Sequence, residues 1–373
     1  MANKTLHIVA FDMPYPPEYG GVIDIFFKIK ALHEMGAKII LHVFLYAGKE
    51  PSRMLEQLCT KVYYYPRRRF KNPFSGELPY IVATRNDADL LRNLRTDQHP
   101  ILFEGLHSTS FLPHPALRNR FKIVRTHNVE HTYYRALEDS ESSFFKKYFF
   151  RIEAERLEKY EPVLRNAQCI AAISPSDTGY YDGKFGNTRY LPAFHSNMEL
   201  LCKPGKGKFV LYHGNMGVGE NNKAALYLVH EVFPQLELPC IIAGNNPSRQ
   251  LQQAVSGQSH ISLADHISSG DILKLVQEAQ VNVMVTFQNT GIKLKLLNSL
   301  HRGRHCVANT MMVENTGLES LVQIGDSADE LVKLIKQCWK EEFTPEMLSR
   351  RKEGLAAGFD NLTNARKLLD WLV

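Results

Sequence analysis

The sequence predicts an α/β protein with two parallel-sheet domains in tandem, and three observations support this prediction. Short apolar or β-branched runs alternate with longer segments of helical spacing, which is the pattern of a parallel sheet covered by helices. The alternation restarts after a Pro/Gly/Lys-rich stretch at 203–208. The 373 residues suffice for two or three domains, and a hydrophobic share of 44% can fill separate cores. We therefore expect two Rossmann-like domains that face a cleft, followed by a helical tail.

The expected elements follow one another in βα order. In the first domain, strands are expected at 6–11, 39–45, 62–65, 101–104, 122–126, 169–173 and 189–191, and helices at 22–35 and 142–164. In the second, strands are expected at 209–213, 240–243, 261–263, 281–287, 305–309 and 321–324, with a helix at 222–232. The predicted boundaries are 1–192 for the N-terminal domain, 193–207 for the linker, 208–343 for the C-terminal domain and 344–373 for a tail that could cross back to the first domain.

Composition excludes several classes of protein. The formal charge of +6 falls short of the profile of a nucleic-acid-binding protein. The six cysteines are dozens of residues apart without a CxxC pair, so neither structural zinc nor a disulfide framework is expected. No run approaches the roughly eighteen apolar residues that cross a bilayer. We expect a cytoplasmic protein without a nucleic-acid partner.

A glycine pair stands between the first expected strand and its helix. Gly20 and Gly21 expose backbone N–H groups at a helix N-terminus, where the helix dipole favours an anion. A diphosphate contact and a turn without a ligand fit this spacing equally well.

A second glycine loop, 214–219, follows the strand at 209–213 and opens the helix that carries Lys223. Its G-x-x-G-x-G spacing differs from the dinucleotide pattern, and the next strand ends at Gly244 without an acidic residue for a ribose. A nicotinamide cofactor is therefore disfavoured, whereas phosphate oxygens still suit this loop.

The segment 290–310 combines a glycine turn, a helix and a strand, and two lysines enter the helix. At 100° per residue, Lys295, Asn298 and Arg302 share one face, while Lys293 lies on another side. A cation here can neutralise a departing diphosphate, on which charge accumulates when a nucleotide–sugar bond breaks. A lysine exposed on a surface helix is the commoner alternative.

Together these motifs resemble those of the retaining GT-B glycosyltransferases, in the large group of bacterial capsule, O-antigen and exopolysaccharide transferases (family 4-like, glycosyl transferases group 1). The resemblance spans nearly the whole chain. It rests on the Gly20-Gly21 loop, Arg125-Thr-His127-Asn-Val-Glu130, His213-Gly214-Asn215 and, most specifically, Gly291-x-Lys293-x-Lys295-Leu-Leu.

The resemblance implies transfer of a sugar from a nucleoside diphosphate sugar to a saccharide or lipid-linked saccharide, with retained anomeric configuration and without metal or cofactor. As catalytic groups, His127 would touch the transferred sugar and Lys295 would hold the diphosphate. The other donor-binding positions would be Gly20, Gly21, Gly214, Asn215, Lys223, Gly244, Gly291, Lys293 and Asn298. At strand ends of the first domain, Glu104, His107 and Glu130 could orient or deprotonate the acceptor, with caps and loop hydrogen bonds as the alternative.

The chain departs from the family pattern around the glycine turn. The family commonly carries two glutamates eight positions apart, and Thr290 and Asn298 occupy these positions here. Asn298 can exchange hydrogen bonds with hydroxyls but lacks the charge of a carboxylate. Two alternatives therefore stay open: a non-catalytic GT-B protein that binds nucleotide or saccharide and, less favoured, an NAD-dependent or epimerising enzyme.

The segment 57–76 carries five basic residues and no acid. Through Arg67, Arg68, Arg69 and Lys71 it could contact anionic lipids at the inner face of the membrane or a lipid-diphosphate acceptor, with a solvated loop as the alternative. The helix at 142–164 has an aromatic stripe, including Phe144, for which we expect core packing rather than membrane insertion.

Overall fold

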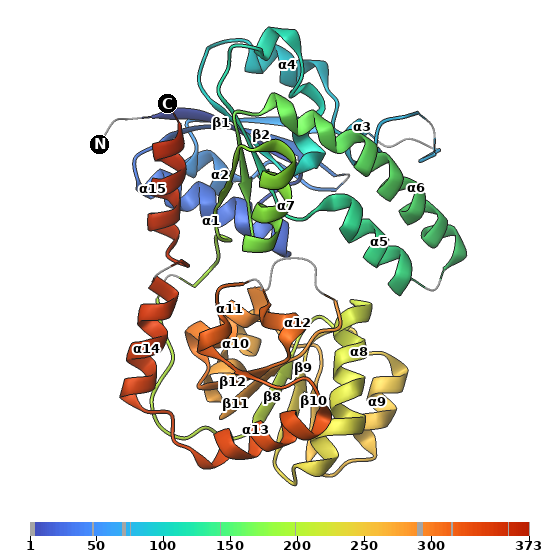
Figure 1. The fold of residues 1–373 in the computed structure, drawn as a ribbon, viewed down its shortest axis with the longest axis vertical. Coiled ribbons are helices and arrows are strands. Elements are labelled where there is room, and N and C mark those ends of the chain that lie inside the picture. Colours follow the sequence, from blue (N-terminus) through green and yellow to red (C-terminus); the bar gives the residue numbers. More distant parts are fainter. Residues whose placement is uncertain are drawn as a thin grey trace. The chain divides into compact units, whose positions relative to one another are not determined.

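The computed structural model describes residues 4–46, 48–68, 72–74, 76–141, 143–197, 199–288, 294–314, 316–356 and 358–372. These residues form two compact units (Figure 1). The first unit comprises the described residues up to 196 and from 359 onward, and the second comprises those between 197 and 358.

The first unit is built on a seven-stranded parallel sheet with the order β3-β2-β1-β4-β5-β6-β7. The strands are β1 (Thr5–Ala10), β2 (Lys38–Leu45), β3 (Lys61–Pro66), β4 (Ile101–Glu104), β5 (Lys122–Thr126), β6 (Cys169–Ala172) and β7 (Thr188–Tyr190). The central strands are buried because helices cover both faces, which explains their near-continuous apolar sequence. Strand order reverses between β1 and β4, where parallel sheets of this type bind ligands.

The helices of the first unit include one from the far end of the chain. They are α1 (Gly20–Glu34), α2 (Arg53–Leu58), α3 (Tyr80–Ala83), α4 (Ala88–Leu94), α5 (Glu130–Ser140), α6 (Phe144–Tyr160), α7 (Pro175–Phe185) and α15 (Asn361–Trp371), with 3-10 turns at Leu106–Phe111, Pro115–Leu117 and Glu161–Asn166. α15 packs beside α1 and adds Ala365 and Leu368 to the core of this unit (Figure 1). Lys4 Nζ donates to the carbonyl oxygens of Leu369 (2.9 Å) and Leu372 (2.6 Å), so both ends of the chain belong to one unit.

The second unit has a six-stranded parallel sheet with the order β10-β9-β8-β11-β12-β13. Its strands are β8 (Val210–His213), β9 (Cys240–Ala243), β10 (Ile261–Ala264), β11 (Val281–Met284), β12 (His305–Ala308) and β13 (Gln323–Ile324). Its helices are α8 (Gly219–Tyr227), α9 (Arg249–Ser256), α10 (Ser269–Glu278), α11 (Leu294–Arg302), α12 (Thr310–Val313), α13 (Ala328–Lys340) and α14 (Pro345–Ala356). A π-helical turn (Leu228–Val232) and 3-10 turns (Phe233–Gln235, Glu319–Leu321) complete it.

Local sequence signals explain where several helices begin and end. Ser174 accepts a hydrogen bond from the backbone N–H of Asp177 at the start of α7, and Gly186 ends that helix with φ +70°. Ser327 and Glu330 form a reciprocal capping box at the start of α13. Two doubly wound parallel sheets thus confirm the predicted fold class.

The expected core packing of the α6 aromatic stripe is wrong at the N-terminal end of the helix. Phe144 is 78% exposed and Phe145 81% exposed, whereas α6 buries Glu153, Ala154 and Leu157. The N-terminal end of the stripe points to solvent because only the C-terminal half of α6 meets the sheet core. None of the helices in the described part of the chain is long and apolar enough to span a membrane.

Candidate functional site

A buried ion cluster lies at the carboxyl end of the first sheet, beside the point where strand order reverses. α1 contributes Asp24 and Lys28, β4 ends at Glu104, β5 carries Arg125, and His127 follows β5; each is at most 5% exposed. Lys28 Nζ lies 2.9 Å from Asp24 Oδ2 and 2.7 Å from Glu104 Oε1. Each carboxylate therefore has a cation, which is required for charges at this depth.

Arg125 fixes Asp24 and the chain that leaves the sheet. Its Nε and Nη2 lie 3.2 Å and 3.0 Å from the two oxygens of Asp24, a two-pronged arrangement that orients the carboxylate. The guanidinium also donates to the carbonyl oxygens of Leu191 and Pro192, and Asp24 accepts from the backbone N–H of Phe194 at 2.8 Å. The cluster thus joins α1, β5 and the segment after β7.

The charge state of the cluster follows from these contacts. Burial alone would raise the pKa of Asp24, but Arg125 and Lys28 outweigh it and hold the pKa well below its ordinary value. Burial would likewise raise the pKa of Glu104, and Lys28 with His127 lowers it instead. Both groups are therefore carboxylates at neutral pH.

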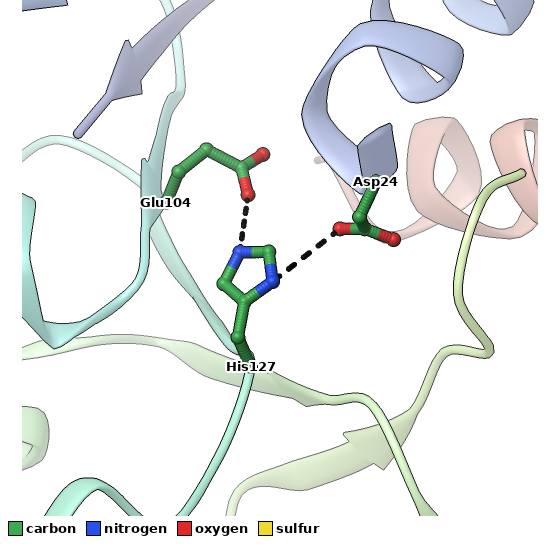
Figure 2. Close-up of side chains that lie close together, drawn as sticks. All are labelled: Asp24, Glu104 and His127. Carbon is green, nitrogen blue, oxygen red and sulfur yellow. Dashed lines mark hydrogen bonds and ion pairs between the residues drawn. The ribbon is translucent and has the colours of Figure 1, made fainter. Parts of the chain in front are cut away.

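His127 stands between these two carboxylates (Figure 2). Its Nε2 lies 3.2 Å from Glu104 Oε2, and its Nδ1 lies 3.9 Å from Asp24 Oδ2 without a hydrogen-bond partner. Glu104 thereby orients the imidazole, as carboxylates commonly orient functional histidines. By donor type, Asp24, Glu104 and His127 could ligate a metal ion, but the Lys28 ammonium already lies between the two carboxylates.

A second pair of titratable groups, Glu130 and His107, lies at the same edge. Glu130 begins α5 and is 3% exposed; burial and then the charge of Asp177 raise its pKa to about 8, against the smaller effects of Asn128 and Arg85. His107 Nδ1 lies 3.9 Å from Glu130 Oε1, and neither atom has a hydrogen-bond partner.

The imidazole of His107 is held in place by its neighbours. It stacks on Phe11, with ring centroids 4.8 Å apart, and burial followed by the charge of Arg85 lowers its pKa well below the ordinary value. Gly105 has φ +68°, and a Cβ there would stand 2.9 Å from His107 Nδ1. A neutral imidazole and a protonated carboxyl group therefore face one another at neutral pH.

The predicted glycine pair forms the start of α1, next to the ring of Phe11. Gly20 is the first residue of α1, and a Cβ at Gly21 would stand 2.7 Å from Phe11 Cζ. Glycine thus allows the helix to approach the ring at the end of β1, so close packing accounts for Gly21 without any ligand.

In the second unit, the loop after β8 is held against the end of β9. A Cβ on Gly244, with φ +154°, would stand 1.7 Å from the carbonyl oxygen of Gly214. Asn215 Oδ1 accepts from the backbone N–H of Gly217 at 3.0 Å. Lys223 is exposed on α8, and its Nζ lies 5.1 Å from the centroid of the Phe287 ring. The loop therefore precedes the α8 N-terminus in a fixed conformation.

The two predicted positions of α11 have different neighbours. Lys295 Nζ donates to Asn221 Oδ1 at 3.0 Å, which brings it to α8 beside the glycine loop. Asn298 Oδ1 accepts from Asn197 Nδ2 at 2.8 Å, and Arg302 Nε lies 3.2 Å from Asn197 Oδ1. Of the three residues predicted to share one face of this helix, Lys295 thus contacts Asn221, whereas Asn298 and Arg302 contact Asn197.

His213, the last residue of β8, is buried beside α11. Burial and then the charge of Lys295 lower its pKa to about 3, and its Nε2 lies 3.4 Å from Ser299 Oγ. A neutral His213 therefore lies next to the cationic Lys295.

Several predicted positions lie outside the described residues: Arg69, Lys71, Thr290, Gly291 and Lys293.

Sequence reasoning missed the residues that organise the first site. Asp24 and Lys28 carried a signal, because a charged pair four residues apart interrupts the apolar face of the expected helix 22–35. Arg125 belongs to the motif Arg125-Thr-His127-Asn-Val-Glu130, but no role was predicted for it from the sequence. Arg85, which is 2% exposed, had no signal at all.

Comparisons with known proteins define the class. Residues 207–341 match the family model described as Glycosyl transferases group 1. A Klebsiella pneumoniae relative, described as an uncharacterized 44.6 kDa protein in the cps region, is 25% identical over 347 residues, which cover 87% of this chain and 88% of that protein.

Solved structures resemble the chain over nearly its full length. The sucrose-phosphate synthase of Thermosynechococcus elongatus has a TM-score of 0.69 and 16% identity, covering 98% of each chain. Anabaena Alr3699/HepE in complex with UDP and glucose has a TM-score of 0.64 and 12% identity, covering 99% of each chain. A Rickettsia africae glycosyltransferase has a TM-score of 0.65 and 13% identity, covering 99% of this chain and 98% of that one.

These likenesses show the GT-B fold. Residues 207–341 carry a glycosyl transferases group 1 domain on that fold, which confirms the resemblance to GT-B glycosyltransferases stated from the motifs.

Proposed function

We propose that this chain transfers a sugar from a nucleoside diphosphate sugar to a saccharide or lipid-linked saccharide in cell-surface polysaccharide biosynthesis. The match of residues 207–341 to the glycosyl transferases group 1 model is the observation that carries the proposal. The relative from a cps region supports the pathway, and the UDP and glucose bound by Anabaena HepE make UDP-sugars the first donors to test. Retention of anomeric configuration and independence of metal are part of the proposal.

In the second unit, Lys295 would stabilise the leaving diphosphate. Its ammonium is held beside the α8 N-terminus by Asn221, where the helix dipole adds positive potential. A fixed cation acts most strongly on the charge that develops as the sugar–phosphate bond breaks. Lys223, the glycine loop at Gly214 and Asn215, and Gly244 would contribute to the same donor site, together with Asn298 and the undescribed Gly291 and Lys293.

In the first unit, His127 would hydrogen-bond the transferred sugar. Glu104 orients its ring, which leaves Nδ1 as the atom without a hydrogen-bond partner. Glu104 itself is committed to Lys28 and His127, so it acts as a positioning residue rather than as a base. Of the predicted acceptor residues, Glu130 and His107 retain unpartnered atoms and would orient the acceptor hydroxyl.

The proposed mechanism relies on positioning and electrostatics. An acceptor hydroxyl would attack the anomeric carbon from the face that the diphosphate leaves, and a leaving phosphate oxygen would take the hydroxyl proton. The sugar–phosphate bond breaks as the new glycosidic bond forms. The protein would supply alignment and charge stabilisation.

The contact with a membrane surface remains a proposal as well. We propose that the chain acts in the cytoplasm, at the inner face of the membrane. Arg68 is exposed and available to anionic lipids, whereas Arg67 is half-buried beside Tyr46. Arg69 and Lys71, which lie outside the described residues, would complete this contact.

Lys295→Ala tests the donor site. We expect UDP-sugar turnover to fall by about two orders of magnitude or more, because one preorganised electrostatic group contributes that much to a transition state. The matched control is Lys333→Ala on the exposed face of α13, which should leave turnover unchanged. Unchanged turnover in Lys295→Ala would refute its role, and nucleotide binding by wild type without turnover of any sugar would favour the non-catalytic alternative.

A further inference from the structure

Three cations surround the ring of Tyr46 at the carboxyl ends of β1, β2 and β3. The ring centroid lies 4.1 Å from Arg67 Cζ, 6.0 Å from Arg85 Cζ and 5.7 Å from Lys49 Nζ. Tyr46 follows β2, Arg67 follows β3 and Arg85 follows α3. These groups therefore lie at the edge of the sheet where parallel sheets of this type bind ligands. They are near β2 and β3, whereas the Asp24 cluster is near β4 and β5.

Arg85 is a buried charge without a carboxylate partner. Its guanidinium donates to the carbonyl oxygens of Phe11 and Ile81, both at 2.6 Å, to Tyr46 Oη at 3.2 Å and to Thr84 Oγ1 at 3.4 Å. All four acceptors are neutral. Across the described ranges, no carboxylate oxygen lies within 4.0 Å of the guanidinium of Arg85 or Arg67.

Asp12 provides only part of the counter-charge, because its charge acts on both guanidiniums without a salt bridge to either. Its carboxylate lies 3.1 Å from Lys49 Nζ and accepts from Tyr19 Oη at 2.7 Å. The guanidinium of Arg67 donates only to Thr84 Oγ1, at 3.2 Å, among the hydrogen bonds of the described chain. Two guanidinium charges beside Tyr46 thus lack a direct carboxylate partner.

Other buried guanidiniums in the described part of the chain show how such charges are balanced. Arg120 lies 3.3 Å from Asp97 Oδ1. Arg125 pairs with Asp24 at 3.0 Å. Arg351 has no carboxylate, but it donates to the carbonyl oxygens of Leu300 and Gly303 at the C-terminus of α11, where the helix dipole is negative. Arg85 has no carboxylate partner, and its helix carbonyl partner, Ile81 O, belongs to the four-residue α3, which is too short for an appreciable dipole. Burying a charge that is paired this weakly is costly unless a ligand pairs with it.

The adjoining groups at this edge are neutral or lack partners. The charges of Arg85 and Arg67 both reach His107, and that of Arg85 reaches Glu130. Glu130 Oε1 and His107 Nδ1 are buried atoms without hydrogen-bond partners. A protonated Glu130 near Arg85 would not repel an anion, so this edge combines positive charge with hydrogen-bonding atoms that lack partners.

We propose that Arg67 and Arg85 bind an anionic group of the acceptor, a phosphate, diphosphate or carboxylate, while Glu130 and His107 bind its hydroxyl groups. This inference rests on the proposed sugar transfer and names the chemical class of the acceptor. A guanidinium suits such a group because its planar fork matches two oxygens at once. The anion belongs either to a polyprenyl diphosphate carrier or to an acidic sugar, and the two sources share this chemistry.

Arg67→Gln is the decisive variant because the Arg67 side chain is half-buried and makes one hydrogen bond, so the fold should survive its loss. Arg53→Gln removes the same charge from an exposed position on α2 and is the matched control. Arg67→Lys keeps the charge but loses the planar fork. Calorimetry with full-length protein saturated with UDP, which blocks the donor site, measures binding of farnesyl diphosphate and of glucuronate.

We expect at least one probe to bind wild type and to bind Arg67→Gln about tenfold more weakly, with an intermediate loss in Arg67→Lys and less than about a twofold change in Arg53→Gln. The probe that binds more tightly identifies the source of the anion. Equal losses in Arg67→Gln and Arg53→Gln would indicate a non-specific effect of positive charge and overturn the proposal, as would the absence of binding by both probes. Binding of UDP itself reports on the proposed function, so a failure there is distinguishable from a failure here.

Discussion

Glu130→Gln should stabilise the first unit by an amount that grows with pH. The folded chain raises the pKa of this buried carboxyl from 4.5 to about 8, chiefly by burial. Between these two values the folded chain binds more protons than the unfolded chain, so Glu130 costs stability progressively as the pH rises. Glutamine has nearly the same shape and no charge, and it removes that cost.

The size of the gain follows from the two pKa values, at about 1.4 kcal/mol per unit. Glutamine should add less than about 0.5 kcal/mol to the free energy of unfolding at pH 4.5, about 2 kcal/mol at pH 6 and roughly 4–5 kcal/mol at pH 9. The gain is complete above the folded pKa and negligible below the unfolded one. Its growth with pH, rather than its absolute size, is the diagnostic result.

The two tryptophans allow the first unit to be followed by itself. Trp371 lies in α15 of the first unit and Trp339 in α13 of the second. In a Trp339→Phe background, urea unfolding monitored by fluorescence therefore reports on the first unit. Glu155→Gln, an exposed position on α6, is the control and should change stability by less than about 0.5 kcal/mol at every pH. A gain that is the same at pH 6 and pH 9 would show that Glu130 titrates near its ordinary pKa and would refute the argument.

Three further substitutions test other contacts. Asp24→Asn removes one of two carboxylates that compensate Lys28 and Arg125, so it should destabilise the first unit by about 3–5 kcal/mol in the same urea assay; a loss below about 1 kcal/mol would contradict the ion cluster. Gly244→Ala should destabilise the second unit by about 2–4 kcal/mol, because the new Cβ collides with a backbone oxygen, while Gly219→Ala, where no atom lies within 4 Å of the Cβ, should cost almost nothing in Trp339 fluorescence. His127→Ala should reduce turnover more than UDP affinity, as compared by steady-state kinetics and calorimetry, and equal losses in both would place His127 outside the sugar site.

Much of the fold follows from local sequence patterns. The apolar runs at 101–104 and 169–173 predict buried parallel strands because helices cover both faces, and the structure has strands there. Pairing between strands is set by contacts across the sheet, so the position of β1 between β2 and β4 could not be predicted in this way. The exposure of the N-terminal end of the α6 aromatic stripe could not be predicted for a related reason. Helical periodicity shows which residues share a face but not what that face contacts.

The candidate site was predictable only where its residues follow strands directly. Glu104 ends an expected strand, His107 and His127 follow the ends of expected strands, and the sheet brings all three to one edge. Their charge states depend on Lys28 and Arg125, which are remote in sequence and whose distances become known only in the folded chain. The role of Arg85 could not be predicted for the same reason. Its burial and the lack of a nearby carboxylate are known only from the folded structure.

Because α15 is at the C-terminal end of the first unit, the two units complete their folding at different times during translation. All described residues of the second unit, between 197 and 358, are synthesised before α15, so that unit can fold while the first still lacks a helix. Until then the face of α1 that α15 covers stays open, and the carbonyl oxygens that Lys4 binds have yet to leave the ribosome. A chain that stops before residue 361 would therefore expose apolar surface in the first unit while its second unit is finished, and such partly completed chains are prone to aggregate.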